Sequence, residues 1–197
     1  MAQNVYSLNV VGYYNVTVPA KGFAMVANQL VTTNQTLAGI LPTAPDGTLF
    51  IKWDGAAYST ANYDELEPGW LPAGAGSRTF DLGEGAFIKN VTDAPMTITF
   101  VGEVKQGQTQ TSLPLGYSIV SLSTPQAGAL PSFDYPYEDG ALVIKWDKVS
   151  QGYKTYNYDE LEPGWMPSTP AVEVGEAFWS KRVTAPASWV RNFTVPQ

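Results

Sequence analysis

The stretch "YNYDELEPGW" occupies Tyr156 to Trp165, and "ANYDELEPGW" occupies Ala61 to Trp70 in the first half of the same chain. An acidic and aromatic phrase written twice in 197 residues indicates an internal repeat. Longer matches surround it in the same order in both halves. They pair "VPAKGFAMV" with "LPLGYSIV", "DGTLFIKWD" with "DGALVIKWD", and "LGEGAFIKN" with "VGEAFWSKR". The sequence therefore predicts a tandem duplication with a unit of about 95 residues.

Alternation of apolar and polar residues predicts β-strands in both copies. In "LFIKWD", Leu49, Ile51 and Trp53 share one face of the expected strand, and Lys52 lies on the other. Gly and Pro supply turns between such segments. Clean alternation is typical of antiparallel sheets with one buried face, so we expect Trp53 and its counterpart Trp146 in the core.

The pattern predicts an all-β protein built from two tandem homologous β-sandwich-like domains related by a pseudo-twofold axis. The first domain is expected to span residues 1–103 and the second residues 104–197. The alternative is one sandwich or barrel to which each repeat contributes half. Only the stretch 33–41 predicts a helix, of roughly two turns.

Composition narrows the range of functions. The chain contains no Cys and no His, which excludes disulfides, thiolate metal sites and the Ser-His-Asp and Cys-His mechanisms. A formal net charge of −7 opposes binding to a phosphate backbone. No apolar run approaches the roughly 20 residues that span a bilayer. We therefore expect no enzymatic activity, no nucleic-acid partner and no transmembrane segment.

The repeated phrase supplies the candidate binding residues. Glu-Pro-Gly-Trp predicts a type II turn with carboxylates before it and an aromatic ring after it. Exposed rings stack on sugars and carboxylates accept hydrogen bonds from sugar hydroxyls, which favours binding of a carbohydrate or a related polymer. The candidates are Trp70, Trp165, Tyr63, Tyr158, Asp64, Asp159, Glu67 and Glu162, flanked by Tyr58, Tyr153 and Tyr156.

Three other interpretations of the phrase remain open. In the first, each Trp packs over the end of a sheet, and the carboxylates solvate the loop or pair with Lys52 and Lys145. In the second, the acidic loops bind Ca²⁺, although "DELE" lacks the spaced ligands of an EF-hand. In the third, paired carboxylates act as in a glycosidase. Calcium is the only cofactor that the sequence suggests.

The blocks "PAKGFAMVANQL", "LFIKWDGAAY", "LGEGAFIKN" and "MTITFVGEV" together resemble exported β-rich proteins of environmental bacteria. The matching positions are Gly22, Phe23, Asn28, Lys52, Trp53, Asp54, Gly55, Gly83, Gly85 and Phe87. The second repeat departs from the pattern, with Leu122 near the position of Asn28 and Ala177 at that of Gly85. The resemblance implies secretion or display at the cell surface and a β-sandwich-like domain, and it implies no reaction.

The first residues, "MAQNVYSLNV", lack the charged and apolar regions of a signal peptide, yet "AQN" resembles a terminus left by a signal peptidase. We therefore expect an exported protein whose signal peptide is absent from this sequence. Two functions follow. The first is non-catalytic binding of a carbohydrate or related polymer outside the cell or on its surface. The alternative is a structural protein of the cell surface or extracellular matrix that self-associates through strand edges into a homo-oligomer or larger assembly.

Overall fold

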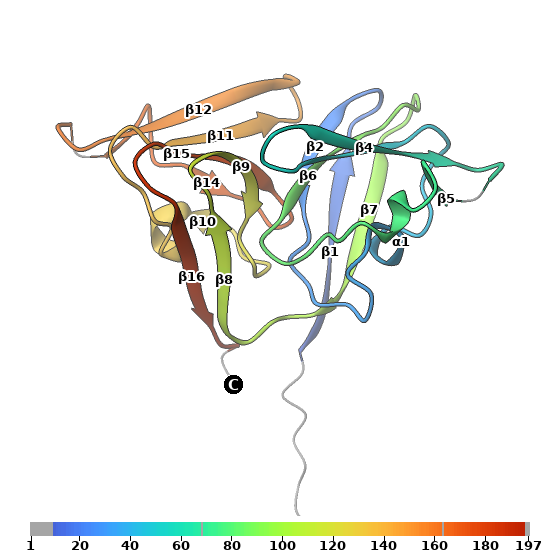
Figure 1. Cartoon of the computed structure of the whole chain (residues 1–197), viewed down its shortest axis with the longest axis horizontal. Helices are drawn as coiled ribbons and strands as arrows, with labels where there is room; N and C mark the ends of the chain where they lie inside the picture. Colours follow the sequence, from blue (N-terminus) through green and yellow to red (C-terminus); the bar gives the residue numbers. More distant parts are fainter. Residues whose placement is uncertain (1–9, 68, 163, 196–197) are drawn as a thin grey trace, which may run out of the picture.

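The structure, a computed structural model, describes residues 10–67, 69–162 and 164–195. It is an all-β protein whose sheets fall into two similar sets, placed side by side in Figure 1. In each set a five-stranded antiparallel sheet lies above a two-stranded one. The predicted pair of β-sandwich-like domains is confirmed. Residues 1–9, which contain the stretch that predicts export, lie outside the described residues. Within the described residues, no helix is long and apolar enough to cross a membrane.

The first repeat pairs β1 with β7 and places its other strands in a sheet of order β2-β6-β3-β4-β5. Its strands are β1 (Val11–Val18), β2 (Phe23–Ala27), β3 (Leu49–Trp53), β4 (Tyr58–Asp64), β5 (Gly69–Leu71), β6 (Gly85–Lys89) and β7 (Met96–Glu103). Two short helices, α1 (Leu37–Ile40) and η1 (Ala75–Ser77), lie in its loops. The predicted two-turn helix is thus a single turn, begun by the Thr36 side chain, which accepts a hydrogen bond from the Gly39 amide.

The second repeat has the same plan. β8 pairs with β16, and the larger sheet has the order β13-β12-β11-β15-β9. Its elements are β8 (Gly107–Leu113), β9 (Gly116–Ser121), β10 (Gly128–Ala129), η2 (Leu130–Phe133), β11 (Leu142–Asp147), β12 (Gly152–Asp159), β13 (Gly164–Met166), β14 (Ala171–Val172), β15 (Ala177–Arg182) and β16 (Ala187–Phe193). The small β10–β14 pair corresponds to an isolated bridge between Thr36 and Thr79 in the first repeat.

Each repeat encloses a core of its own. In the first, Val16 on β1 and Ile98 on β7 face Phe50 on β3. In the second, Leu113 and Trp189 belong to an equivalent cluster. No sheet among the described strands combines residues from both sides of the predicted division at 103 and 104, and none closes into a barrel. The alternative of one sandwich or barrel made from two half repeats is therefore wrong.

The alternation in β3 was predicted correctly, but the core face was not. Phe50 is fully buried in the first core, whereas Ile51 and Trp53 lie half-buried on the opposite face of the sheet. Val143 takes the place of Phe50 in the second repeat, and Trp146 that of Trp53. Each larger sheet thus has two apolar faces. One face covers the core of its own repeat, and the other contacts the opposite repeat.

Matched contacts relate the two repeats by the expected pseudo-twofold axis. The bridge between Val26 and Glu176 has its counterpart between Glu84 and Val120. The amide of Ala27 donates to the carbonyl of Gly175 at 3.0 Å, and that of Ser121 donates to the carbonyl of Gly83 at 2.9 Å. Each contact is thus made twice with the roles of the repeats exchanged, which is what a twofold axis requires.

Two equivalent positions, Gly85 on β6 and Ala177 on β15, pack against each other at the interface of the repeats. A Cβ atom at Gly85 would lie 2.4 Å from the Cβ atom of Ala177 and 2.6 Å from Cγ2 of Ile119. There is room for one methyl group and not for two. The glycine at position 85 is therefore a packing requirement of the interface, because residue 177 already carries a methyl group.

Candidate functional site

The repeated turns bury the aromatic rings that the sequence predicts to be exposed. Trp70 is 5% exposed and Trp165 is 8% exposed. The indole N–H of Trp70 donates to the carbonyl of Leu41 at 2.9 Å, and Tyr63, itself buried, lies edge-on to the same ring. Tyr158, which is half-buried, contacts Trp165 in the same way. These rings close the ends of the two cores, so their faces are not available to stack on a ligand.

The carboxylates of the phrase shape the turns. Oδ1 of Asp64 accepts hydrogen bonds from the amides of Leu66 at 2.8 Å and Glu67 at 3.1 Å. Asp159 does the same in the second repeat, at 2.8 Å and 3.3 Å. The Asp of the phrase therefore caps the same loop in both halves of the chain. The φ angles of Gly69 and Gly164, 157° and 148°, differ from the type II value near +80°, so the predicted turn type is wrong.

The structure does not bring the two turns together. They lie at opposite ends of the molecule, one beyond the end of β4 and the other beyond the end of β12 (Figure 1). Glu67 and Glu162 are exposed there. Within the described residues no group of three or more acidic side chains is arranged to hold a metal ion, so the calcium interpretation gains no ligand set.

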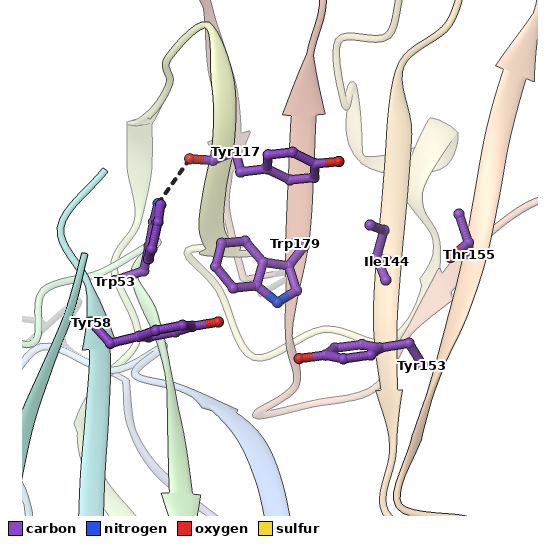
Figure 2. A pocket seen from close by; sticks show the side chains of 7 residues that line it. All are labelled: Trp53, Tyr58, Tyr117, Ile144, Tyr153, Thr155 and Trp179. Carbon is purple, nitrogen blue, oxygen red and sulfur yellow. Dashed lines mark hydrogen bonds between the residues drawn. The ribbon is translucent and has the colours of Figure 1, made fainter. Parts of the chain in front are cut away.

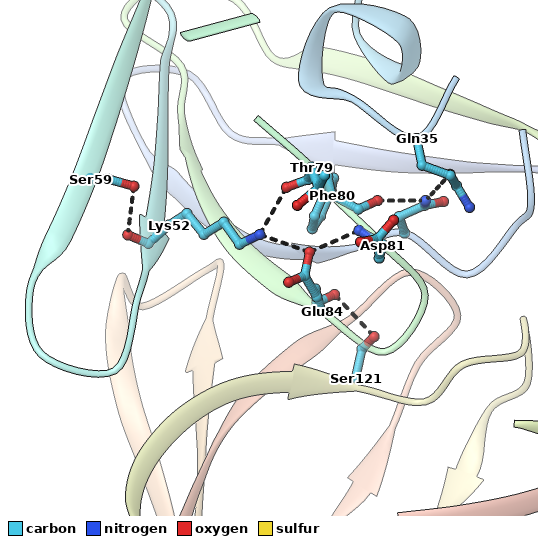
Figure 3. Close-up of polar contacts among 9 residues, drawn as sticks. Gln35, Lys52, Ser59, Thr79, Phe80, Asp81, Glu84 and Ser121 are labelled. Atoms are coloured by element: carbon cyan, nitrogen blue, oxygen red, sulfur yellow. Dashed lines mark hydrogen bonds and ion pairs between the residues drawn. The ribbon is translucent and has the colours of Figure 1, made fainter. Parts of the chain in front are cut away.

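Lys52 and Lys145 pair with carboxylates outside the repeated phrase. Lys52 Nζ lies 2.8 Å from Glu84 and donates to the carbonyl of Thr79 (Figure 3). Lys145 pairs with Glu176 at 3.0 Å. The expected pairing of these lysines with the turn carboxylates is therefore wrong, because they point to the core side of the sheet.

Two open pockets lie where the repeats meet. They lie on the faces of the larger sheets that point away from each repeat's own core. The first, of about 430 Å³, is lined by Trp53, Tyr58, Tyr117, Ile144, Tyr153, Thr155 and Trp179. The second, of about 380 Å³, is lined by Phe23, Ile51, Tyr58, Thr60, Phe87, Trp146 and Tyr153. Both draw residues from both repeats and share Tyr58 and Tyr153. We refer to them as pocket 1 and pocket 2, and together as the twin cleft.

The two pockets are mates under the pseudo-twofold axis. The repeat alignment and the strand registers relate every lining residue of pocket 1 to one of pocket 2. The pairs are Trp53 with Trp146, Tyr58 with Tyr153, Tyr117 with Phe23, Ile144 with Ile51, Thr155 with Thr60, and Trp179 with Phe87. Tyr58 and Tyr153 exchange with each other, so this pair lies across the axis between the pockets.

Hydrogen bonds across the interface hold the two equivalent tryptophans. The indole N–H of Trp53 donates to the carbonyl of Tyr117 at 3.0 Å, and that of Trp146 donates to the carbonyl of Phe23 at 3.0 Å. Each ring also lies edge-on to the tyrosine of its own hairpin, Tyr58 at 5.1 Å and Tyr153 at 4.8 Å between centroids. The walls of the twin cleft are thus fixed by the contact that joins the repeats.

Three polar groups converge where the pockets meet. Tyr58 and Tyr153 are 51% and 54% exposed, and their hydroxyl groups point toward one another beside the indole of Trp179 (Figure 2). Within the described residues, neither hydroxyl nor the Trp179 N–H has a hydrogen-bond partner. Partial burial raises the pKa of Tyr58 above its ordinary value, and the neighbouring Tyr153 adds to the rise. At neutral pH Tyr58 is therefore a hydroxyl donor and acceptor.

The pockets differ in polarity and in the hairpin beside them. Pocket 1 has Tyr117 and Trp179 where pocket 2 has Phe23 and Phe87. The β11–β12 hairpin is two residues longer than the β3–β4 hairpin. Its Gln151 accepts a hydrogen bond from the Phe23 amide at 2.7 Å and donates to the Phe23 carbonyl at 3.1 Å. Phe23 is therefore held more firmly than Tyr117.

Comparison of the chain with protein-family models, with curated proteins and with solved structures finds no match. The resemblance to exported β-rich proteins of environmental bacteria stays a prediction.

Sequence reasoning placed most of the twin cleft elsewhere. Tyr58 and Tyr153 were identified only as neighbours of the turns, and Trp53 and Trp146 were assigned to the core. One signal in the sequence identifies the second apolar face: Phe50 and Val143 interrupt the polar side of strands whose other side is already apolar. Such a strand needs cover on both faces. That the second cover leaves an open cleft depends on how the repeats pack, which alternation does not encode.

Proposed function

We propose that this protein is a non-catalytic binding protein of the cell surface or extracellular space, and that it binds a carbohydrate or related polymer in the twin cleft. The observation that carries the proposal is the pair of symmetry-related aromatic pockets with Tyr58 and Tyr153 between them. The binding site thus moves from the repeated turns to the interface of the repeats.

The lining has the chemistry of a site for rings that carry hydroxyl groups. Aromatic side chains supply apolar faces, and a few convergent polar groups give orientation. The hydroxyls of Tyr58 and Tyr153 and the N–H of Trp179 are such groups, and Thr60 and Thr155 add one hydroxyl to each pocket. A polymer chain could place one unit in each pocket, so two weak contacts would act together.

The lining also favours binding over catalysis. Among the residues that the structure describes, no carboxylate lines either pocket, whereas glycoside hydrolysis requires two that flank the bond to be broken. Glu84 makes an ion pair with Lys52, and Asp64 caps its own turn. A protein that holds a polymer without cleaving it fits these groups.

The experiment is a binding screen against soluble polysaccharides by affinity electrophoresis and calorimetry. Wild-type protein should bind at least one polymer, and Tyr58→Ala with Tyr153→Ala should weaken its binding at least tenfold, or about 1.4 kcal/mol. The control is Tyr13→Ala, which removes a tyrosine that is 74% exposed on β1, away from the cleft. Equal affinity in the double variant and the wild type would overturn the placement of the site.

A second candidate function is self-association of a structural protein, and one observation favours it. Leu66 and Leu161, at equivalent positions in the two turns, are 94% and 93% exposed. An apolar side chain at each end of the molecule would suit end-to-end contacts between copies. Sedimentation velocity over a wide concentration range tests this. Assembly that is lost in Leu66→Ser with Leu161→Ser would support it, and a wild-type monomer at high concentration would remove it.

A further inference from the structure

Each pocket of the twin cleft leads outward to a lysine and an asparagine on the same face of the sheet. In the first repeat, Lys89 pairs with both Phe23 and Leu49, and Leu49 pairs with Asn62. Directly paired residues share a face, so these side chains form one row across four strands. The equivalent row of the second repeat is Tyr117, Lys181, Leu142 and Asn157.

The aromatic rings of the pockets hold the two lysines at the rim. The ammonium of Lys89 lies 5.3 Å from the ring centroid of Phe23 in pocket 2, and that of Lys181 lies 5.4 Å from the ring of Tyr117 in pocket 1. Packing of a lysine stem on a ring keeps the charged end at the water boundary. The two ammonium groups therefore mark the outer ends of the twin cleft.

Neither lysine is neutralised by the protein. Ion pairs engage six other Lys and Arg side chains, but within the described residues Lys89 and Lys181 have none. The charged groups that face the same side at the far ends of β4 and β12 are Asp64 and Asp159, and their carboxylates cap their own turns. In a chain of net charge −7, two unpaired cations at equivalent rims stand out.

We propose that the ligand is an acidic polysaccharide, a polymer of sugar rings bearing carboxylates, and that Lys89 and Lys181 bind carboxylates on units at the two ends of the bound segment. The inference rests on the proposed function and adds the chemical class of the polymer. An ammonium supplies the charge, and the amides of Asn62 and Asn157, which have no hydrogen-bond partner in the described part of the chain, supply neutral donors. The sugar rings occupy the aromatic pockets between the lysines.

The test compares polymers that differ only in charge. Polygalacturonate is paired with its methyl ester, and carboxymethyl cellulose with hydroxyethyl cellulose, and binding is measured by calorimetry at low and high salt. Wild-type protein should bind the acidic member of a pair at least tenfold more tightly at low salt. The preference should shrink as salt screens the charges.

Two double variants separate a local effect from net charge. Lys89→Gln with Lys181→Gln should abolish the preference for the acidic polymer and leave affinity for the neutral one within about threefold of wild type. Lys105→Gln with Lys148→Gln makes the same change in net charge at two exposed lysines that line neither pocket of the twin cleft, and it should keep the preference.

The outcomes distinguish the two proposals. If wild-type protein binds the neutral member as tightly as the acidic one, and Tyr58→Ala with Tyr153→Ala abolishes that binding, the acidic ligand is wrong while the polymer-binding function stands. If both lysine double variants reduce the preference equally, net charge explains it and the assignment to Lys89 and Lys181 is overturned. If no polysaccharide binds, both proposals fail.

Discussion

The first repeat contributes Phe23 and Phe87 to the twin cleft, whereas the second contributes Tyr117 and Trp179 at the same places. The frameworks beneath are alike, with the same strand order and the same tryptophan hydrogen bond across the interface. Four of the six related pairs in the cleft lining are identical in the two repeats, so the difference between the pockets lies in these two pairs alone. The twin cleft therefore consists of one more polar pocket and one more apolar pocket.

The largest expected effects concern the cores, where the repeats differ in one hydrogen bond. Trp70→Ala and Trp165→Ala should each lower the free energy of unfolding by about 3–5 kcal/mol, because both rings are buried. Trp70→Ala should be the more damaging, since it also leaves the Leu41 carbonyl unpaired, whereas the Trp165 N–H has no partner within the described residues. Urea denaturation followed by circular dichroism measures both. A loss below about 1 kcal/mol in either variant would contradict the burial of these rings.

The pseudo-twofold contact gives the next largest effect. Gly85→Ala should destabilise the protein by about 1–3 kcal/mol, because its methyl group overlaps that of Ala177. Combining Gly85→Ala with Ala177→Gly removes the overlap with Ala177 and leaves the one with Cγ2 of Ile119, so it should recover part of that loss. Gly12→Ala is the control, since its Cβ atom would meet only Val104 Cγ2 at 3.7 Å. Thermal denaturation compares the variants, and a double variant no more stable than Gly85→Ala would argue against the contact.

The difference in pocket polarity can be removed by substitution. Tyr117→Phe with Trp179→Phe gives pocket 1 the aromatic lining of pocket 2. The change deletes an O–H and an N–H, so polymer affinity should fall about tenfold or more at roughly 1 kcal/mol for each lost hydrogen bond. Calorimetry with the best-bound polymer of the screen measures the loss. Unchanged affinity would mean that pocket 1 contributes only through its rings.

The smallest effect concerns the hairpins that carry Tyr58 and Tyr153. The Lys154 ammonium and the amides of Ser150 and Val149 hold the pKa of Asp147 well below its usual value. The equivalent Asp54 has its pKa lowered by the amides of Ala57 and Ala56. A lowered carboxyl pKa contributes stability above the unfolded value near 3.9, and this contribution is lost as pH falls toward the folded value.

Stability should therefore decline below about pH 4, and Asp147→Asn should flatten that decline more than Asp54→Asn. Asn keeps the oxygen that accepts the turn hydrogen bonds, so the loop itself is conserved. Urea midpoints measured between pH 2 and 6 provide the comparison. If the urea midpoint falls with pH at the same rate in the two variants, the ion pair between Asp147 and Lys154 adds nothing to the stability of the turn.

Sequence patterns predicted the framework well because it depends on local rules. Repetition indicated two domains, and alternation located strands such as β3, whose Ile51 and Trp53 share one face as predicted. The structural role of Asp64 as a turn cap was not predicted, because the same residue sequence is compatible with an exposed binding loop and with a capped turn. The twin cleft was missed because it joins residues from both repeats, and no pattern within one repeat contains the geometry of their packing.

The Gly85–Ala177 contact also bears on how such a surface can arise. In a homodimer of single repeats, both subunits would carry the same residue at the axis, so two glycines would leave a gap and two alanines would collide. Joining the copies in one polypeptide removes that obligation. A residue in one half can then change while the equivalent residue in the other half stays the same. Selection can therefore act separately on the two sides of a junction that began as symmetric.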